Sequence, residues 1–111
     1  MEGCIFCRIA RGEVEAQVVY EDERVIAFRD INPQAPVHVL VIPKEHIVDI
    51  REAGEDILGR LARATVEVAR REGVFESGFR VVVNCGPDSG AEVPHLHFHV
   101  LGGRRMGWPP G

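Results

Sequence analysis

Hydrophobic and polar residues alternate in several short runs of the chain, and this two-residue period predicts β-strands. Residues 18–30 read VVYEDERVIAFRD, two runs rich in β-branched and aromatic residues around three acidic ones, which is typical of a hairpin. Residues 37–42 form the next apolar run, and Pro36 and Pro43 bracket it because proline cannot donate to a β-ladder. Residues 79–83 and 94–101 predict two further strands.

One longer stretch, residues 54–73, has the period of a helix. Ile57, Leu61, Thr65 and Val68 recur there at steps of three and four, with charged residues between them, and Gly73 marks the expected end of the helix. Strands on both sides of a single main helix predict an α+β fold, in which a five-stranded antiparallel sheet is covered by that helix.

Length and composition fit one folded unit. The chain has 111 residues, of which 45% are hydrophobic and 27% are charged, and no repeat or linker divides it. We therefore expect a single domain over residues 1–111. Because so short a chain leaves much of its surface exposed, we also expect it to pair as a homodimer.

Charge and hydropathy exclude some partners. A net charge of −4 does not provide the basic surface that a nucleic acid polymer requires. No leader sequence is evident, and no apolar run approaches the roughly 20 residues of a membrane span, so we expect a cytoplasmic protein without a membrane partner. In that reducing compartment the cysteines, with Cys4 and Cys7 in a C-x-x-C pair, suggest metal ligation or free thiols before disulfides.

The candidate chemistry concentrates on the last predicted strand, where His95, His97 and His99 alternate with apolar residues. A period of two places all three imidazoles on one face and the apolar residues on the other. Three interpretations are open: a merely polar strand face, a metal centre in which two histidines at i and i+2 share a zinc ion, and nucleophilic catalysis by a neutral imidazole beside an imidazolium that protonates the leaving group.

The turn before these histidines, residues 84–90 with the sequence NCGPDSG, favours a phosphorus electrophile. Successive backbone amides in a glycine-rich turn can bind an oxyanion, and the amide of Asn84 adds a neutral donor. Standing so close to the imidazoles, the turn would let a phosphate and a nucleophile share one site. Cys85 in the same turn is interpreted as a loop thiol, since no evident base lies beside it.

The run from His95 to Leu101, HLHFHVL, resembles the H-φ-H-φ-H-φ-φ signature of the histidine triad (HIT) superfamily, in which φ is apolar. The resemblance also covers CIFCRIARGE near the N-terminus, residues 28–47 and the tail LGGRRMGWPPG, and so spans nearly the whole chain. It is strongest to the Hint-type branch, homodimeric proteins that hydrolyse adenosine phosphoramidates and aminoacyl-adenylates. This resemblance implies a purine nucleotide substrate and no organic cofactor.

The same resemblance implies roles for individual residues. His97 would be the nucleophile that forms a covalent nucleotidyl intermediate, His99 would contact the phosphate and assist leaving-group protonation, and His38 would complete the network. His95, the first histidine of the triad, is counted with this catalytic set. The implied nucleotide-binding residues are Asp30 for the ribose, Ile5, Phe6, Ile9, Phe28 and Ile31 for the purine, Asn84, Gly90, Glu92 and Val93 together with His97 and His99 near the phosphate, and Trp108 near the partner subunit's site.

Two positions depart from the family pattern. Where many relatives read G-Q-S or G-Q-T, this chain has Ala91 and Glu92 after Gly90, so a hydroxyl that would steady the leaving group is missing. A carboxylate at that position predicts a preference for a cationic amine over an anionic leaving group. Pro94, directly before the triad, removes a backbone donor and is expected to begin the strand.

A metal site is implied as well, because Cys4, Cys7, His46 and His95 resemble a zinc site of several bacterial HIT proteins. Four such ligands would form a closed, structural, tetrahedral zinc site. The alternative is that both cysteines are inert thiols of a short helix. For the activity, the alternatives are a dinucleoside polyphosphate hydrolase of the Fhit type, which the tail WPPG disfavours, and a regulatory module that binds nucleotides without turnover.

Overall fold

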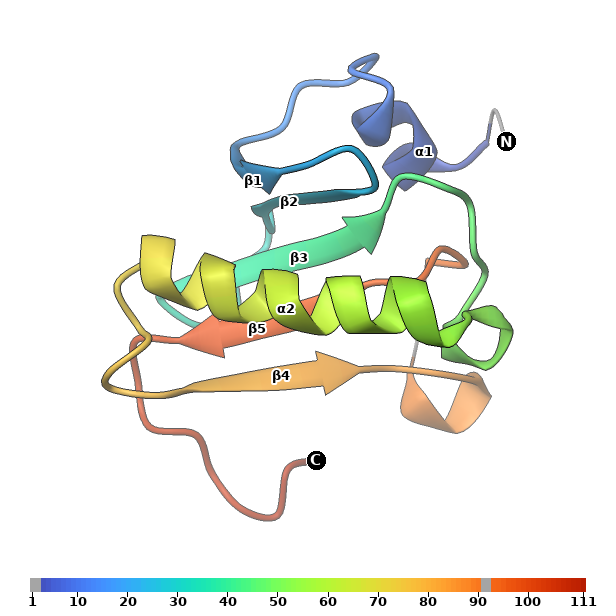
Figure 1. The fold of residues 1–111 in the computed structure, drawn as a ribbon. Helices are drawn as coiled ribbons and strands as arrows, with labels where there is room; N and C mark the ends of the chain where they lie inside the picture. The colour runs from blue at the N-terminus through green and yellow to red at the C-terminus, as the bar shows by residue number, and fades with distance from the viewer. Residues whose placement is uncertain (1–2, 91–92) are drawn as a thin grey trace.

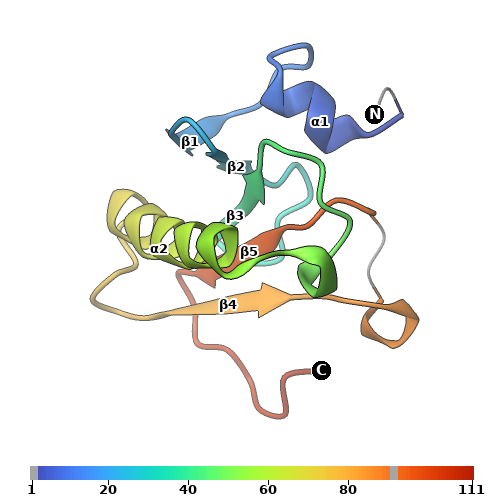
Figure 2. The same ribbon diagram turned by 45° about the vertical axis from the view of Figure 1, so that its right-hand side comes forward.

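The computed structural model describes residues 3–90 and 93–111, and its centre is a five-stranded antiparallel sheet (Figure 1). The sheet order is β1-β2-β3-β5-β4, with β1 (Val18–Glu21), β2 (Val25–Arg29), β3 (Val37–Pro43), β4 (Phe79–Val83) and β5 (Phe98–Gly102). The main helix, α2 (Glu55–Arg71), lies across the sheet, and the short α1 (Ile5–Ala10) lies beyond β1 and β2 (Figures 1 and 2). Single turns of 3-10 helix occupy Ile50–Glu52 and Pro87–Ser89. The predicted α+β fold is confirmed.

Helix α2 covers one face of the sheet with an apolar stripe. Ile57, Leu61, Ala64 and Val68 repeat at helical spacing and are buried, and Leu61 is fully enclosed. Their partners are the alternate strand residues of that face: Val25, Ala27, Val39, Val41, Phe98 and Val100. Burying one such aliphatic side chain contributes about 1.5–3 kcal/mol. No helix in the described part of the chain is long and apolar enough to cross a bilayer.

The opposite face carries a second, smaller apolar cluster and the polar residues of interest. Ile26, Phe28, Leu40 and Ile42 alternate with the helix-facing residues and pack against Phe6 of α1. In the register of β3 and β5, Leu40 lies opposite His99 and His38 lies opposite Leu101. Because side chains alternate between faces, the sheet places His38 and His99 on this α1 side.

The last strand begins later than predicted. We expected it to start at Pro94, but β5 begins at Phe98, so His95 and His97 precede the ladder. The reason is a tertiary contact: the His95 side chain reaches the carbonyl of Pro43 (Nε2 to O, 2.9 Å), and the backbone N–H of Leu96 donates to Ile47. This segment therefore bonds to the chain that leaves β3 instead of continuing the β3–β5 ladder.

Candidate functional site

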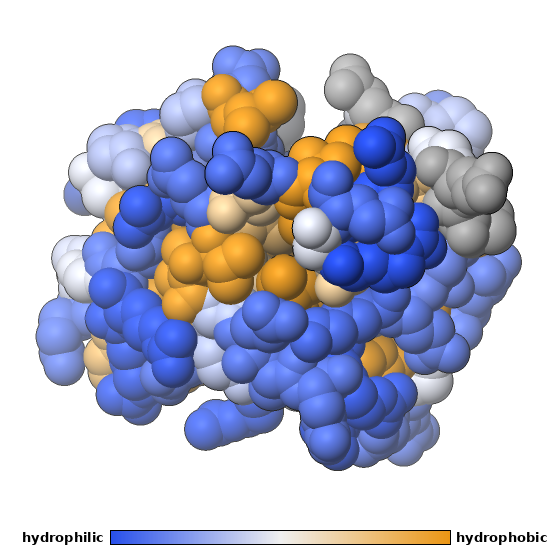
Figure 3. All heavy atoms as spheres, turned by 90° about the horizontal axis from the view of Figure 1, so that it is seen from above, coloured by the Kyte–Doolittle hydropathy of each residue, from blue (hydrophilic) through white to orange (hydrophobic). Residues whose placement is uncertain are grey.

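A cleft of about 1190 Å³ opens on the face of the sheet that α2 leaves free. Seen from the α1 end, apolar side chains gather toward the middle of the surface with polar side chains around them (Figure 3). Most of the predicted site residues meet in this one cleft: Ile5, Phe6, Ile9, Phe28, Asp30, Ile31, His38, Asn84, Gly90, Val93, His97 and His99. Side chains implied for purine, ribose and phosphate thus line a single space.

The apolar wall of the cleft is built around Phe6. Its ring meets Phe28 edge-on at 5.6 Å between centroids and meets His97 in the same way at 5.2 Å. Ile5 is 41% exposed and Ile31 is fully exposed, so both stand at the mouth of the cleft. Leu40 also lines the wall and was not predicted, although its position two residues after His38 on a strand was the available signal.

The tautomer of His97 follows from its hydrogen bond. Nδ1 lies 2.7 Å from the backbone carbonyl of His95, and because a carbonyl only accepts, Nδ1 carries the proton and donates. In the neutral ring the lone pair is then on Nε2. A neutral imidazole with a fixed donor on one nitrogen and a lone pair on the other has the form that a nucleophile requires.

His38 and His99 form a chain of oriented donors. The backbone N–H of Gln34 donates to Nδ1 of His38 at 3.0 Å, so the proton of neutral His38 is on Nε2. That Nε2 lies 2.9 Å from Nδ1 of His99, which accepts it. The proton of neutral His99 is therefore on its own Nε2. Sequence analysis missed Gln34, because its contribution comes from the backbone and carries no side-chain signal.

Burial keeps this pair neutral. Desolvation lowers the pKa of His99 to about 4, and electrostatic repulsion from the His97 and His38 rings acts in the same direction. Burial also lowers the pKa of His38, which the nearby Asp30 carboxylate partly opposes. At neutral pH the free protein accordingly presents His99 as an uncharged hydrogen-bond donor.

Asp30 stands at the end of β2 beside these histidines. Its Oδ1 accepts the backbone N–H of Asn32 at 2.9 Å, and its Oδ2 lies 3.4 Å from Nε2 of His38. Each carboxylate oxygen has a second lone pair, so the group retains acceptor capacity toward the cleft that it lines.

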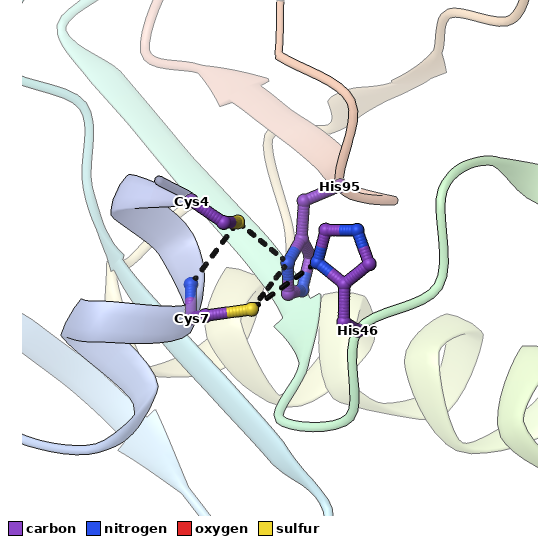
Figure 4. A group of neighbouring side chains, drawn as sticks. All are labelled: Cys4, Cys7, His46 and His95. Atoms are coloured by element: carbon purple, nitrogen blue, oxygen red, sulfur yellow. Dashed lines mark hydrogen bonds between the residues drawn. The ribbon is translucent and has the colours of Figure 1, made fainter. Parts of the chain in front are cut away.

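The second cluster is the predicted metal set, which the fold brings together from three segments (Figure 4). Cys4 Sγ lies 3.2 Å from Nδ1 of His95, and Cys7 Sγ lies 3.2 Å from Nδ1 of His46 and 3.5 Å from Nδ1 of His95. All four donor atoms lie within 4.8 Å of one another. Around a tetrahedral zinc ion with bonds of about 2.0–2.3 Å, ligand atoms are spaced by about 3.3–3.8 Å, so the set has nearly the required dimensions.

The protonation states of the cluster also suit a metal. The contact of His95 Nε2 with the Pro43 carbonyl places the proton there and leaves a lone pair on Nδ1, the nitrogen that faces the thiols. Burial lowers the pKa of His95, which favours this neutral form. Burial raises the pKa of the Cys7 thiol, and a divalent cation would supply the charge that stabilises its thiolate.

Asp30, His38 and His99 form another group of possible ligands within 4.8 Å, but its hydrogen bonds argue against a metal. The Gln34 amide occupies Nδ1 of His38, so Nε2 carries a proton and cannot ligate without breaking that bond. His95 has the opposite tautomer. Its protonated Nε2 contacts the Pro43 carbonyl, so the lone pair is on Nδ1, which faces the other possible ligands.

The remaining predicted residues lie elsewhere. Trp108 is 82% exposed and stacks with Arg80, whose guanidinium carbon lies 5.9 Å from the ring, and it does not line the cleft of this chain. Glu92 lies outside the described residues. Cys85 is half-buried and does not line the cleft.

Known proteins resemble this chain over most of its length. The family model described as "HIT domain" matches residues 11–106. A "14 kDa zinc-binding protein" of Zea mays is 51% identical over 96% of this chain and 87% of its own. "Adenylylsulfatase HINT1" of Arabidopsis thaliana is 49% identical over 96% of this chain and 76% of its own. The crystal structure of a HIT family hydrolase from Legionella pneumophila is 49% identical, with a TM-score of 0.92 over 97% of this chain and 99% of that one.

The family match covers most of the chain, and it includes the five histidines, the sheet and every cleft residue except Ile5, Phe6 and Ile9 of α1. The chain therefore belongs to the HIT family.

Proposed function

We propose that this protein transfers the nucleotidyl group of adenosine or guanosine 5′-phosphoramidates and aminoacyl-adenylates to water through a covalent bond to His97. The observation that carries the proposal is the Nδ1 contact of His97 with the His95 carbonyl, which leaves Nε2 as the lone-pair nitrogen in a cleft with Asp30 and His99. A purine would lie along Phe6, Phe28 and the neighbouring apolar residues.

The reaction would proceed by two displacements. The Nε2 lone pair of His97 attacks the α-phosphorus, an N–P bond forms, and the P–N bond to the leaving amine breaks as that nitrogen takes a proton. Water then attacks the same phosphorus, the bond to His97 breaks, and the nucleoside monophosphate departs while the water proton passes to solvent or a neighbouring base. Retention of Nδ1–H by His97 throughout keeps the ring neutral at the start and end of the cycle.

His99 would act first on the phosphate. Its Nε2–H donates to a nonbridging oxygen, and His38 holds it in that tautomer through the 2.9 Å contact. A bound phosphate adds negative charge beside the ring, which raises the pKa of His99 from about 4 toward its ordinary value. That change would let His99 deliver the leaving-group proton in the complex, although it is neutral in the free protein.

The comparisons support a second leaving group. The Arabidopsis relative is named an adenylylsulfatase, and attack on the α-phosphorus of adenylyl sulfate would expel sulfate by the same first step. A Fhit-type dinucleoside polyphosphate hydrolase would use the same nucleophile, and a regulatory module would bind nucleotide without bond cleavage. These alternatives differ in the product released, and in whether any product forms.

Trapping separates these activities. Wild-type protein and the His97→Gly variant are incubated with an adenosine phosphoramidate, adenylyl sulfate and a diadenosine polyphosphate, and adducts and products are identified by mass spectrometry. We expect an adenylylated wild-type peptide containing His97 and a loss of turnover of at least about a thousandfold in the variant, since a nucleophile has been removed. Turnover that survives in His97→Gly would refute the mechanism.

We further propose that Cys4, Cys7, His46 and His95 hold a structural zinc ion. The distances and tautomers of the four residues support it, as does the name of the Zea mays relative. In this role the ion would join α1 to the segments that follow β3 and precede β5. Protein purified without a His tag should contain about one zinc per chain by elemental mass spectrometry, and Cys7→Ser should contain far less.

The proposed partner in assembly is a second copy of the chain. Strand β4 lies at the edge of the sheet, its outer backbone groups have no partner strand among the described residues, and Val81 on it is 40% exposed. Light scattering after gel filtration should give twice the chain mass, and Val81→Lys should shift the protein toward monomer. A monomeric wild type would exclude the dimer.

A further inference from the structure

We propose that the cluster of Cys4, Cys7, His46 and His95 positions the nucleotide cleft, so that loading it with zinc sets the affinity of the cleft for nucleotides. This inference rests on the proposed function, and it assigns the metal cluster a part in binding beyond holding the fold. It follows from two links between the cluster and the cleft that use different atoms.

The first link is helix α1. Cys4 caps this helix and Cys7 is its third residue, while Ile5, Phe6 and Ile9 of the same helix line the cleft. A helix of six residues is too short to be stable by itself. Within the described chain, each hydrogen bond that joins residues 4–10 to a distant segment runs through the thiol of Cys4 or Cys7 to an imidazole. Phe6 also anchors α1 through its apolar contacts with the sheet, so the metal ligands supply the polar attachments of the cleft wall and the apolar cluster supplies the rest.

The second link is the backbone between His95 and His97. The ring of His95 is fixed by Pro43 on one side and by the thiols on the other, and the carbonyl of the same residue accepts the proton of His97 Nδ1. Phe6 contacts both rings edge-on, at 5.8 Å from His95 and 5.2 Å from His97. A shift of His95 would thus move both the hydrogen bond that sets the nucleophile's tautomer and the ring packed beside it.

The main core is separate from the first link, but it includes Leu96, which lies between His95 and His97 in the second link. The apolar cluster under α2 contains none of the four ligands and no residue of α1. We therefore expect removal of the metal to loosen α1 before it loosens α2 or the core-anchored backbone at Leu96, since local openings follow the weakest contacts.

The test measures nucleotide binding in forms that differ in metal content. The dissociation constant of AMP is determined by calorimetry for zinc-loaded wild type, chelator-treated wild type and His46→Gln, because His46 does not line the cleft. Cys85→Ser is the matched control, a cysteine outside the cluster. We expect AMP to bind about tenfold more weakly to the two metal-depleted forms, the effect of losing apolar contact of one or two side chains with the base. The control should bind normally.

Hydrogen exchange locates the change and covers the case of a poorly folded variant. Faster exchange in residues 5–10 with α2 unchanged supports the inference, whereas an equal rise in α2 overturns it, because the ion would then hold the whole fold. Unchanged AMP affinity after confirmed loss of zinc overturns it as well.

Zinc-loaded Phe6→Ala distinguishes this inference from the proposed function. If that variant binds AMP as wild type does, the nucleotide is not in this cleft and the proposed function fails. If it binds AMP weakly while His46→Gln binds it normally, only the link to the metal fails.

Discussion

Nε2 of His38 lies 2.9 Å from Nδ1 of His99, and the Gln34 backbone amide on the far side of His38 decides the direction of that hydrogen bond. A protonated His99 would carry a second proton on Nδ1, against the Nε2–H of His38. The contact therefore opposes protonation of His99 in the free protein, in addition to the burial that lowers its pKa to about 4.

This arrangement predicts a stability that depends on pH. The pKa of His99 in the folded chain lies below its ordinary value of 6.5, so the unfolded chain takes up the proton first as the pH falls. The contribution of His99 to the free energy of unfolding is constant above pH 6.5. It decreases as the pH falls from 6.5 to about 4. His38, His97 and Asp30 face the ring, and His38 shifts in the same direction.

The pH dependence of stability is tested by measuring the melting temperatures of wild type and His99→Gln at pH 7 and pH 5. We expect wild type to lose more stability between the two values, by on the order of 1 kcal/mol, because glutamine cannot titrate. Equal losses in the two proteins would mean that His99 titrates normally in the folded chain.

Asp30→Asn tests whether Asp30 binds the ribose of the nucleotide. A hydrogen bond to a carboxylate contributes about 1.5–3 kcal/mol and one to a neutral amide about 0.5–1.5 kcal/mol, so KM for a ribonucleotide substrate should rise about 5- to 10-fold. The 2′,3′-dideoxy analogue is the control in the same variant, because it reports any disturbance of His38, which lies 3.4 Å from Asp30. A similar rise for both substrates would assign Asp30 to the histidine network and not to the sugar.

The apolar pattern of the sequence was sufficient for most of the fold. Helix α2 and each strand bury one face, so apolar residues repeat along the sequence with a period of 3.6 in the helix and of 2 in the strands. Helix α1 was raised only as an alternative, because six residues are too few to show a period. The C-x-x-C pair indicated the kind of ligand, but the contact of Cys4 with His95 joins residues 91 positions apart, which only the fold can bring together.

The start of β5 and the tautomers of the histidines depend on contacts that no local pattern contains. Pro94 was the predicted first residue of the last strand. In the structure the side chain of His95 donates to the carbonyl of Pro43, and β5 begins at Phe98. The sequence identified His97 among three equivalent histidines only by resemblance. The tautomer of His97, with the proton on Nδ1, follows from its hydrogen bond to the backbone carbonyl of His95.

Leu61→Ala tests the separation of core and cleft. Leu61 is fully buried under α2, so truncation should lower the free energy of unfolding by about 2–5 kcal/mol, measured by urea denaturation. Arg63→Ala, at an exposed position of the same helix, should change it by less than about 0.5 kcal/mol. Folded Leu61→Ala should bind AMP as wild type does, since α2 lies on the other face of the sheet. Weaker binding would show that the two faces are coupled.

Glu92 provides the test of leaving-group preference. It directly precedes Val93, which lines the cleft, and a carboxylate there repels an anionic leaving group and attracts a cationic amine. Removing the charge should therefore lower the ratio of kcat/KM for a cationic-amine phosphoramidate to that for adenylyl sulfate. A charge–charge interaction of about 1 kcal/mol corresponds to about a fivefold change in this ratio.

Two replacements separate the charge from the hydroxyl that many relatives carry. Glu92→Gln removes only the charge and should give the fivefold change, while Glu92→Ser also adds a hydroxyl and should further raise kcat/KM for both substrates. If the ratio stays at the wild-type value in both variants, the carboxylate does not select the leaving group. A change in Glu92→Ser alone would assign the selection to the missing hydroxyl, because the charge is absent from both variants.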